Sequence, residues 1–133
     1  MSGEEAAQGY VLDASALLAL LHGEPGGEAV EEVLGASAMS SVNWSEVVQK
    51  ALEKKTKIEG LREELESLGL EIIPFTADLA EETARLRAET KSAGLSLGDR
   101  ACLALAGDLG RPALTADKVW RDLPLRVEVR VVR

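Results

Sequence analysis

Short apolar segments alternate with longer amphipathic segments along the 133-residue chain. Five of the apolar segments are bounded by turn residues and have the length of strands; they cover residues 10–12, 37–39, 70–75, 112–114 and 127–132. The segments between them have helical spacing; they cover residues 14–21, 27–34, 42–57, 58–68, 77–93 and 97–109. Strands that alternate with helices predict a parallel sheet covered on both faces. We therefore expect a three-layer α/β/α sandwich with a mostly parallel sheet of about five strands.

Length and composition point to one globular domain. The chain is 46% hydrophobic and 29% charged, and no apolar run approaches the roughly 20 residues that cross a bilayer. Residues 1–9 are small and acidic, so we expect a flexible tail followed by a single domain over residues 10–133. The only cysteine, Cys102, excludes an internal disulfide and a multi-cysteine zinc site, and it fits a cytoplasmic setting.

The charge and the motifs exclude several kinds of nucleic-acid and nucleotide binding. A net charge of −8 repels polynucleotides, so a contact with one requires a local basic patch or bound cations. Two Trp, one Tyr and one Phe are too few for a base-stacking platform. The sequence contains no GxxxxGK and no GxGxxG loop, which excludes the common phosphate-binding folds.

Four acidic residues follow predicted strands or begin predicted helices. Asp13 and Asp117 follow the first and fourth strands, Glu46 follows the second, and Asp99 begins the last helix. Each residue taken singly also fits a helix cap, because Asp13 and Asp117 occupy N-cap positions and residues 43–46 and 96–99 have capping-box spacing. Capping, however, does not require four carboxylates to converge.

Ligands of an open parallel sheet bind beyond the carboxyl ends of its strands, which is where these acids are expected. Two carboxylates about 4 Å apart repel by roughly 4 kcal/mol at an effective dielectric of 20, so a cluster needs a cation or shared protons. Oxygen ligands without His or Cys suit Mg²⁺ or Mn²⁺. Such an ion activates water and stabilises a leaving oxygen, so the acids indicate phosphodiester hydrolysis.

Four segments, YVLDASALLALL, SSVNWSEVVQKAL, LSLGDRACLALA and ALTADKVW, resemble in order and spacing the signature segments of PIN-domain ribonucleases, specifically the VapC-like toxins of toxin–antitoxin pairs. The resemblance implies an endoribonuclease that acts on RNA with Mg²⁺ or Mn²⁺. It also implies that Asp13, Glu46, Asp99 and Asp117 are catalytic and bind the metal, and that Ser15 and Thr115 orient them. A VapB-like antitoxin and a second copy of the chain are the expected protein partners.

Three basic residues, Arg100, Lys118 and Arg121, neighbour the acids in sequence and are candidates for contacts with RNA phosphates. Two other functions remain open. One is a Mg²⁺-dependent phosphatase or phosphotransferase with a strand-end aspartate as nucleophile, although such enzymes usually carry a second carboxylate where this chain has Ser15. The other is a non-catalytic α/β module that binds a partner and whose acids are only caps.

Overall fold

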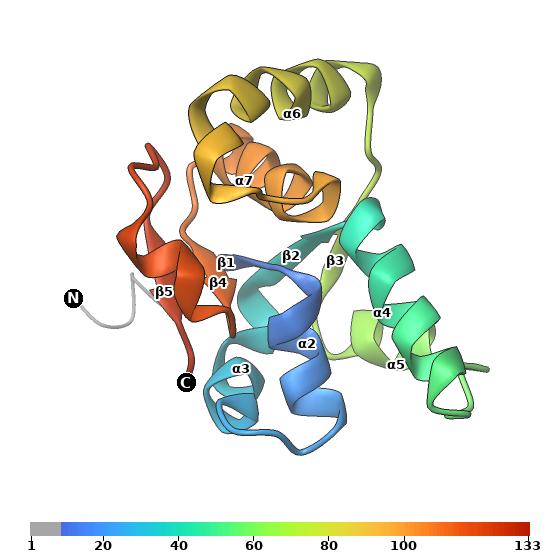
Figure 1. Ribbon diagram of the computed structural model, residues 1–133. Coiled ribbons are helices and arrows are strands. Elements are labelled where there is room, and N and C mark those ends of the chain that lie inside the picture. Colours follow the sequence, from blue (N-terminus) through green and yellow to red (C-terminus); the bar gives the residue numbers. More distant parts are fainter. Residues whose placement is uncertain (1–8) are drawn as a thin grey trace.

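A five-stranded sheet forms the middle layer of the computed structural model, which describes residues 9–133 (Figure 1). Its strands are β1 (Tyr10–Leu12), β2 (Ser37–Ser40), β3 (Glu71–Ile73), β4 (Ala113–Thr115) and β5 (Val129–Val131). They lie in the order β3-β2-β1-β4-β5, and all four neighbouring pairs are parallel. The predicted three-layer α/β fold is therefore confirmed.

Helices cover both faces of the sheet (Figure 1). The α-helices are α2 (Ala14–Leu21), α3 (Gly27–Val33), α4 (Ser41–Glu53), α5 (Leu61–Ser67), α6 (Ala77–Thr90) and α7 (Leu97–Leu109). Short 3₁₀ helices are η1 (Leu34–Ala36), η2 (Lys91–Ala93) and η3 (Lys118–Asp122). The first four α-helices contribute side chains to the core on one face, and α6 and α7 pack over the other.

The side-chain alternation of the strands divides the core in two. Val11 of β1 packs with Ala113 of β4, Cys102 and Trp120 on the face covered by α7. The next residue, Leu12, points to the opposite face, where it packs with the side chains of α2 and α3. Both faces of the central strands are apolar, which explains why these strands appear in the sequence as short continuous hydrophobic runs.

The two helices on either side of residues 54–60 are shorter than their sequence patterns predict. The helix predicted over residues 42–57 ends at Glu53, and Lys55 adopts a positive φ of 57°. The next helix, predicted over residues 58–68, begins only at Leu61, after Gly60 in the left-handed region. The intervening residues are polar and exposed, apart from the half-buried Ile58, so little packing stabilises a helix there.

Of the predicted tail, residues 1–8 lie outside the described residues. Gly9 is buried with a φ of +72°, and a Cβ on it would lie 1.7 Å from the Ala36 carbonyl oxygen, so only glycine fits. Within residues 9–133, the structure contains no helix with the length and apolar character of a membrane span.

The strand order defines where a ligand site is expected. From β1 the chain adds β2 and β3 on one side, and then places β4 and β5 on the other side of β1. The order therefore reverses between β1 and β4, and the carboxyl ends of these two strands flank the crevice that parallel α/β sheets use for ligands.

Candidate metal-binding active site

Asp13 lies directly after β1 at the centre of a hydrogen-bonded cluster. Its side chain is 5% exposed, and its Oδ1 accepts from the Ser15 hydroxyl and the Ala16 N–H, both at 2.8 Å. Its Oδ2 accepts from the Thr115 hydroxyl at 2.5 Å. The bond from Ala16 makes Asp13 the N-cap of α2, as the sequence predicts. Asp13 therefore caps a helix and also accepts hydrogen bonds from hydroxyl groups of two different segments.

Two hydroxyl groups join the end of β1 to the end of β4. Ser15 Oγ accepts from the Ala116 N–H at 2.9 Å, and Thr115 Oγ1 accepts from the Asp117 N–H at 3.0 Å. The two hydroxyl oxygens lie 3.2 Å apart. Both hydroxyl protons go to Asp13, so the lone pairs accept the backbone N–H groups. The network fixes the backbone of Asp117 relative to Asp13 at the crevice between the two strands.

Burial makes the Asp13 carboxylate costly to ionise. Desolvation raises its pKa from 3.8 to about 6, hydrogen bonds from Thr115, Ala16 and Ser15 oppose the rise, and the charge of Asp99 adds to it. A pKa of about 6 corresponds to about 3 kcal/mol of lost stability when Asp13 is ionised at neutral pH. Three hydrogen bonds therefore do not compensate for the burial of this charge.

Glu46 on α4 and Asp99 on α7 approach the same region. Cys102 is fully buried on α7, and burial raises the pKa of its thiol. The negative charges of Asp13, Asp99 and Glu46 raise that pKa further, in decreasing order. Three of the four predicted acids therefore lie close enough to one sulfur atom to act on it electrostatically.

The structure confirms one predicted capping box and contradicts the other. Ser96 Oγ accepts from the Asp99 N–H at 3.1 Å, and Asp99 Oδ2 accepts from the Ser96 N–H at 2.9 Å. The box predicted over residues 43–46 is wrong, because α4 begins two residues before Asn43 and its N-cap is Ser40. Asn43 lies inside the first turn, where its side chain bonds to that of Glu46 instead of to a backbone N–H.

Among the four predicted acids, Asp117 differs from Asp13 in that it is exposed to solvent. Its side chain is exposed, and its Oδ1 accepts from the Val119 N–H at 3.0 Å, which makes it the N-cap of η3 as predicted. Its backbone, not its carboxylate, is hydrogen-bonded to Thr115 of the Asp13 cluster.

The three basic candidates have different surroundings. Arg100 is half-buried, and its Nη1 donates to the Thr83 carbonyl of α6 at 2.9 Å, so its guanidinium is engaged within the fold. Lys118 and Arg121 on η3 are exposed, and neither forms an ion pair within residues 9–133. These two lie directly after Asp117.

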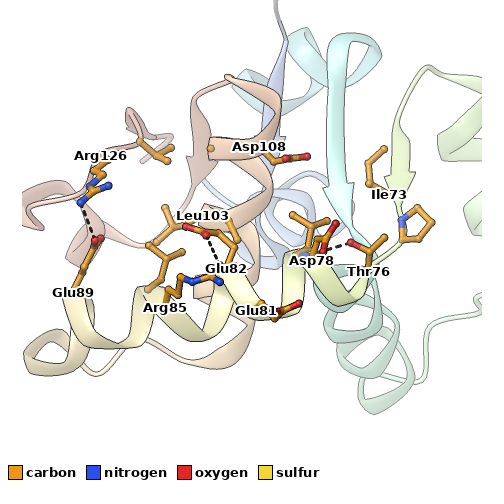
Figure 2. Close-up of a pocket in the computed structure, with 16 residues that line it drawn as sticks. Ile73, Thr76, Asp78, Glu81, Glu82, Arg85, Glu89, Leu103, Asp108 and Arg126 are labelled. Carbon is orange, nitrogen blue, oxygen red and sulfur yellow. Dashed lines mark hydrogen bonds and ion pairs between the residues drawn. The ribbon is translucent and has the colours of Figure 1, made fainter.

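A large cavity lies elsewhere, between α6 and α7 (Figure 2). Its volume is about 870 Å³, and its lining includes the apolar Leu79 and Leu103 and the acidic Asp78, Glu81 and Asp108. None of the four predicted acids lines it. Its position therefore separates it from the crevice at the strand ends.

Comparison with known proteins assigns the chain to a family. A family model described as PIN domain matches residues 10–125. The chain belongs to the PIN domain family. The resemblance predicted from the four sequence segments is thereby confirmed, and no curated protein matches the chain. PIN domains are nucleases and generally use divalent metal ions.

Solved structures with the same PIN fold include a chain of a toxin–antitoxin complex from Klebsiella pneumoniae, with a TM-score of 0.75 and 26% identity over 93% of this chain and 98% of that chain. A chain of DNA-bound VapBC from Salmonella typhimurium has a TM-score of 0.70 and 17% identity, and the match covers 94% of this chain and 98% of that chain. A chain of FitAcB from Neisseria gonorrhoeae has a TM-score of 0.67 and 21% identity, and the match covers 90% of this chain and 95% of that chain. The last two likenesses establish the fold alone.

The side chains of this PIN domain fit a hard divalent cation by their chemistry. A carboxylate has about four acceptor positions, and three on Asp13 are used, two on Oδ1 and one on Oδ2. Oδ2 thus retains one position for a cation. As the side chains stand, no group of three or more His, Cys, Asp or Glu in residues 9–133 is arranged to enclose an ion. Magnesium keeps several waters when bound, so ligation by fewer direct carboxylates is compatible with it.

Sequence reasoning missed two residues at this site of the PIN domain. Asn43 was considered only as a cap, yet it bonds to Glu46 and to the Gly98 carbonyl of α7. Gly98 has no Cβ, and one placed there would lie 2.4 Å from a carboxylate oxygen of Glu46. The signal in the sequence is the glycine immediately before Asp99, inside a helix where glycine is otherwise unfavourable.

Proposed function

We propose that the protein is a metal-dependent endoribonuclease and the toxin of a toxin–antitoxin pair. One observation carries the proposal: the buried carboxylate of Asp13 lies at the sheet's switch point and accepts hydrogen bonds from hydroxyl groups of two segments, and the charges of Asp13, Asp99 and Glu46 all act on the one buried thiol of Cys102. Membership of a nuclease family and similarity to a toxin–antitoxin complex support it.

The proposal assigns a role to each of the four acids. Asp13 and Asp99 are the main ligands of Mg²⁺ or Mn²⁺, directly or through water, and Glu46 and Asp117 complete the site and orient the attacking water. When bound, the ion lowers the pKa of that water and stabilises the leaving oxygen.

Ser15 and Thr115 act through Asp13. Their hydroxyl groups fix the rotamer of its carboxylate and leave one position open on Oδ2. Thr115 also holds the Asp117 backbone, so the ends of β1 and β4 keep one geometry.

RNA reaches this acidic site past a small basic surface. Lys118 and Arg121 on η3 are exposed and lie beside Asp117, so they are the better candidates for phosphate contacts. Arg100 remains a candidate only if its bond to the Thr83 carbonyl is exchanged for one to RNA.

A non-catalytic module is the competing function, because Asp13, Asp99 and Asp117 all do cap helices. The energies argue against capping as the only role of Asp13. An N-cap contributes about 1 kcal/mol, and asparagine caps as well as aspartate. The cost of ionised Asp13 at neutral pH, about 3 kcal/mol, already includes the capping bond from Ala16, so capping does not offset it.

The protein partners of the proposed function are a VapB-like antitoxin and a second copy of this chain. The similarity to a chain of the toxin–antitoxin complex from Klebsiella pneumoniae supports the first.

The decisive experiment incubates the purified protein with total RNA, with and without Mn²⁺, and maps the new 5′ ends. We expect cleavage only with the ion, and none with the Asp13→Asn variant. Equal cleavage by Asp13→Asn would overturn the assignment. If Mn²⁺ neither supports cleavage nor raises the melting temperature beyond the effect of ionic strength, the acids are caps only.

A matched control separates the site from overall charge. Neutralising Asp78, Glu81 and Asp108, which line the α6–α7 cavity (Figure 2), removes three negative charges from a cavity that none of the four predicted acids lines. We expect this triple variant, Asp78→Asn with Glu81→Gln and Asp108→Asn, to keep its cleavage rate or to gain slightly from weaker repulsion of RNA.

A further inference from the structure

Asn43 joins two helices that each carry a predicted acid. The residue is 1% exposed, and its Nδ2 donates to Glu46 Oε1 at 2.9 Å and to the Gly98 carbonyl oxygen at 3.0 Å. Glu46 belongs to α4, and Gly98 immediately precedes Asp99 in the first turn of α7. One amide group therefore sets the distance between the starts of the two helices.

The orientation of this amide is determined by its partners. A carboxylate and a carbonyl only accept hydrogen bonds, so the NH₂ group must face both of them and the amide oxygen must point elsewhere. That oxygen, Asn43 Oδ1, is buried and accepts no hydrogen bond from any group of residues 9–133. A buried acceptor without a donor is unfavourable, so this oxygen can accept a hydrogen bond from a water molecule.

The Glu46 carboxylate is confined between Asn43 and Gly98. A Cβ on Gly98 would lie 2.4 Å from Oε2 and 2.5 Å from Oε1 of Glu46, so the carboxylate occupies the space that a side chain at residue 98 would fill. Oε1 is used by Asn43, whereas Oε2 has no hydrogen-bond partner within residues 9–133. The free oxygen is the one available to a ligand.

We propose that Asn43 is a positioning residue for the divalent-cation site. Its Nδ2 holds Glu46 Oε1 against the start of α7 so that Oε2 faces the cation, and its Oδ1 accepts a hydrogen bond from a water held there. This inference rests on the proposed function, because it assigns a role in the same site. It adds to the four acids a neutral side chain that determines where one of them points.

The test compares Asn43→Leu and Asn43→Ala with wild type in the full-length protein. Leucine keeps the branched shape and the number of heavy atoms of the side chain, removes the donor and removes the unpaired oxygen. Alanine removes the same groups and leaves space, which provides a second variant if leucine does not fit. Thr90→Val is the matched control, because Thr90 is a buried polar helix residue, 3% exposed, whose hydroxyl donates only to the Leu86 carbonyl of its own helix at 2.8 Å.

Four quantities are measured for each variant: the melting temperature, the dissociation constant of Mn²⁺ by calorimetry in the absence of RNA, and kcat and KM for RNA cleavage. Loss of a residue that orients a metal ligand typically weakens metal affinity or activity by about 10–100-fold. We expect losses of that size in Mn²⁺ affinity and in kcat for both Asn43 variants, with KM unchanged. Thr90→Val should keep both quantities.

The outcomes distinguish this inference from the function on which it rests. If Asn43→Leu binds Mn²⁺ and cleaves RNA as wild type does, Asn43 only fills space and the inference is wrong. If wild type binds Mn²⁺ but does not cleave RNA, the proposed function fails, while the tenfold or greater loss of Mn²⁺ affinity still supports the role of Asn43. If wild type does not bind Mn²⁺, both are overturned.

Discussion

Replacing Asp13 by asparagine should stabilise the metal-free protein and abolish cleavage at the same time. Asparagine preserves the hydrogen bonds in a rearranged form. Its Oδ1 accepts from Ser15 and Ala16 as the aspartate does, its NH₂ donates to Thr115 Oγ1, and the Thr115 hydroxyl turns toward Ser15 Oγ, 3.2 Å away. The change therefore removes a charge without leaving a buried polar atom unpaired.

The size of the expected stabilisation follows from the pKa of Asp13, which is about 6 in the folded protein and 3.8 ordinarily. Above pH 7 the carboxylate is ionised in both states, and burial costs the folded state about 3 kcal/mol. Asparagine removes this cost, which for a chain of this length raises the melting temperature by on the order of 10 °C.

The pH dependence has a defined sign. Because the folded pKa is higher than the unfolded one, the folded protein binds the proton more tightly, and the cost of Asp13 disappears as the pH falls from about 6 to 3.8. The difference in stability between Asp13→Asn and wild type should therefore be largest above pH 7 and vanish near pH 4.

The assay is thermal unfolding of both proteins in EDTA from pH 4 to 8, repeated with Mn²⁺. Wild type should gain about 3 kcal/mol at an ion concentration a hundred times its Kd, whereas the variant should gain little. A variant that is less stable than wild type at pH 7.5 in EDTA would refute the reasoning, since the buried charge would then contribute no penalty.

Three further substitutions test neighbouring contacts. Thr115→Val removes a donor that lowers the pKa of Asp13, so that pKa should rise further and Mn²⁺ affinity measured by calorimetry should fall about 10–100-fold. Gly98→Ala would gain about 1 kcal/mol from helix propensity alone, but its Cβ meets the Glu46 carboxylate, so we expect no gain in melting temperature and a lower cleavage rate. Lys118→Ala should weaken RNA binding and reduce its salt dependence, and an unchanged slope of log K against log salt would exclude a phosphate contact.

The parallel sheet could be predicted because it follows from local pattern. Short apolar runs between amphipathic segments predict parallel strands, and the residues after them are expected at one edge of the sheet. The pairing of β1 with β4, which brings the ends of these two strands side by side, is not specified by the pattern and comes from the structure. Val11 and Leu12 contact opposite faces of the sheet because successive side chains of a strand alternate between its two faces.

The start of α4 could not be predicted, because several residues there are competent caps. Ser40, Ser41 and Asn43 all favour an N-cap, so local preference does not choose between them. The choice depends on β2, which stays paired with β3 as far as Ser40 opposite Ile73. The helix begins directly afterwards, and Asn43 enters its first turn with its side chain free to reach Gly98. Tertiary pairing therefore created a contact that sequence spacing did not indicate.

Capping and metal binding are not exclusive explanations for these acids. A helix N-terminus carries about half a positive charge, and Asp13 lies at one, which already favours its ionised form. Asp13 nevertheless keeps a pKa of about 6 with three hydrogen bonds and the start of α2 beside it. Since asparagine would cap α2 without the penalty, an aspartate there is disadvantageous unless something offsets its charge, and a divalent cation at its open Oδ2 position would do so.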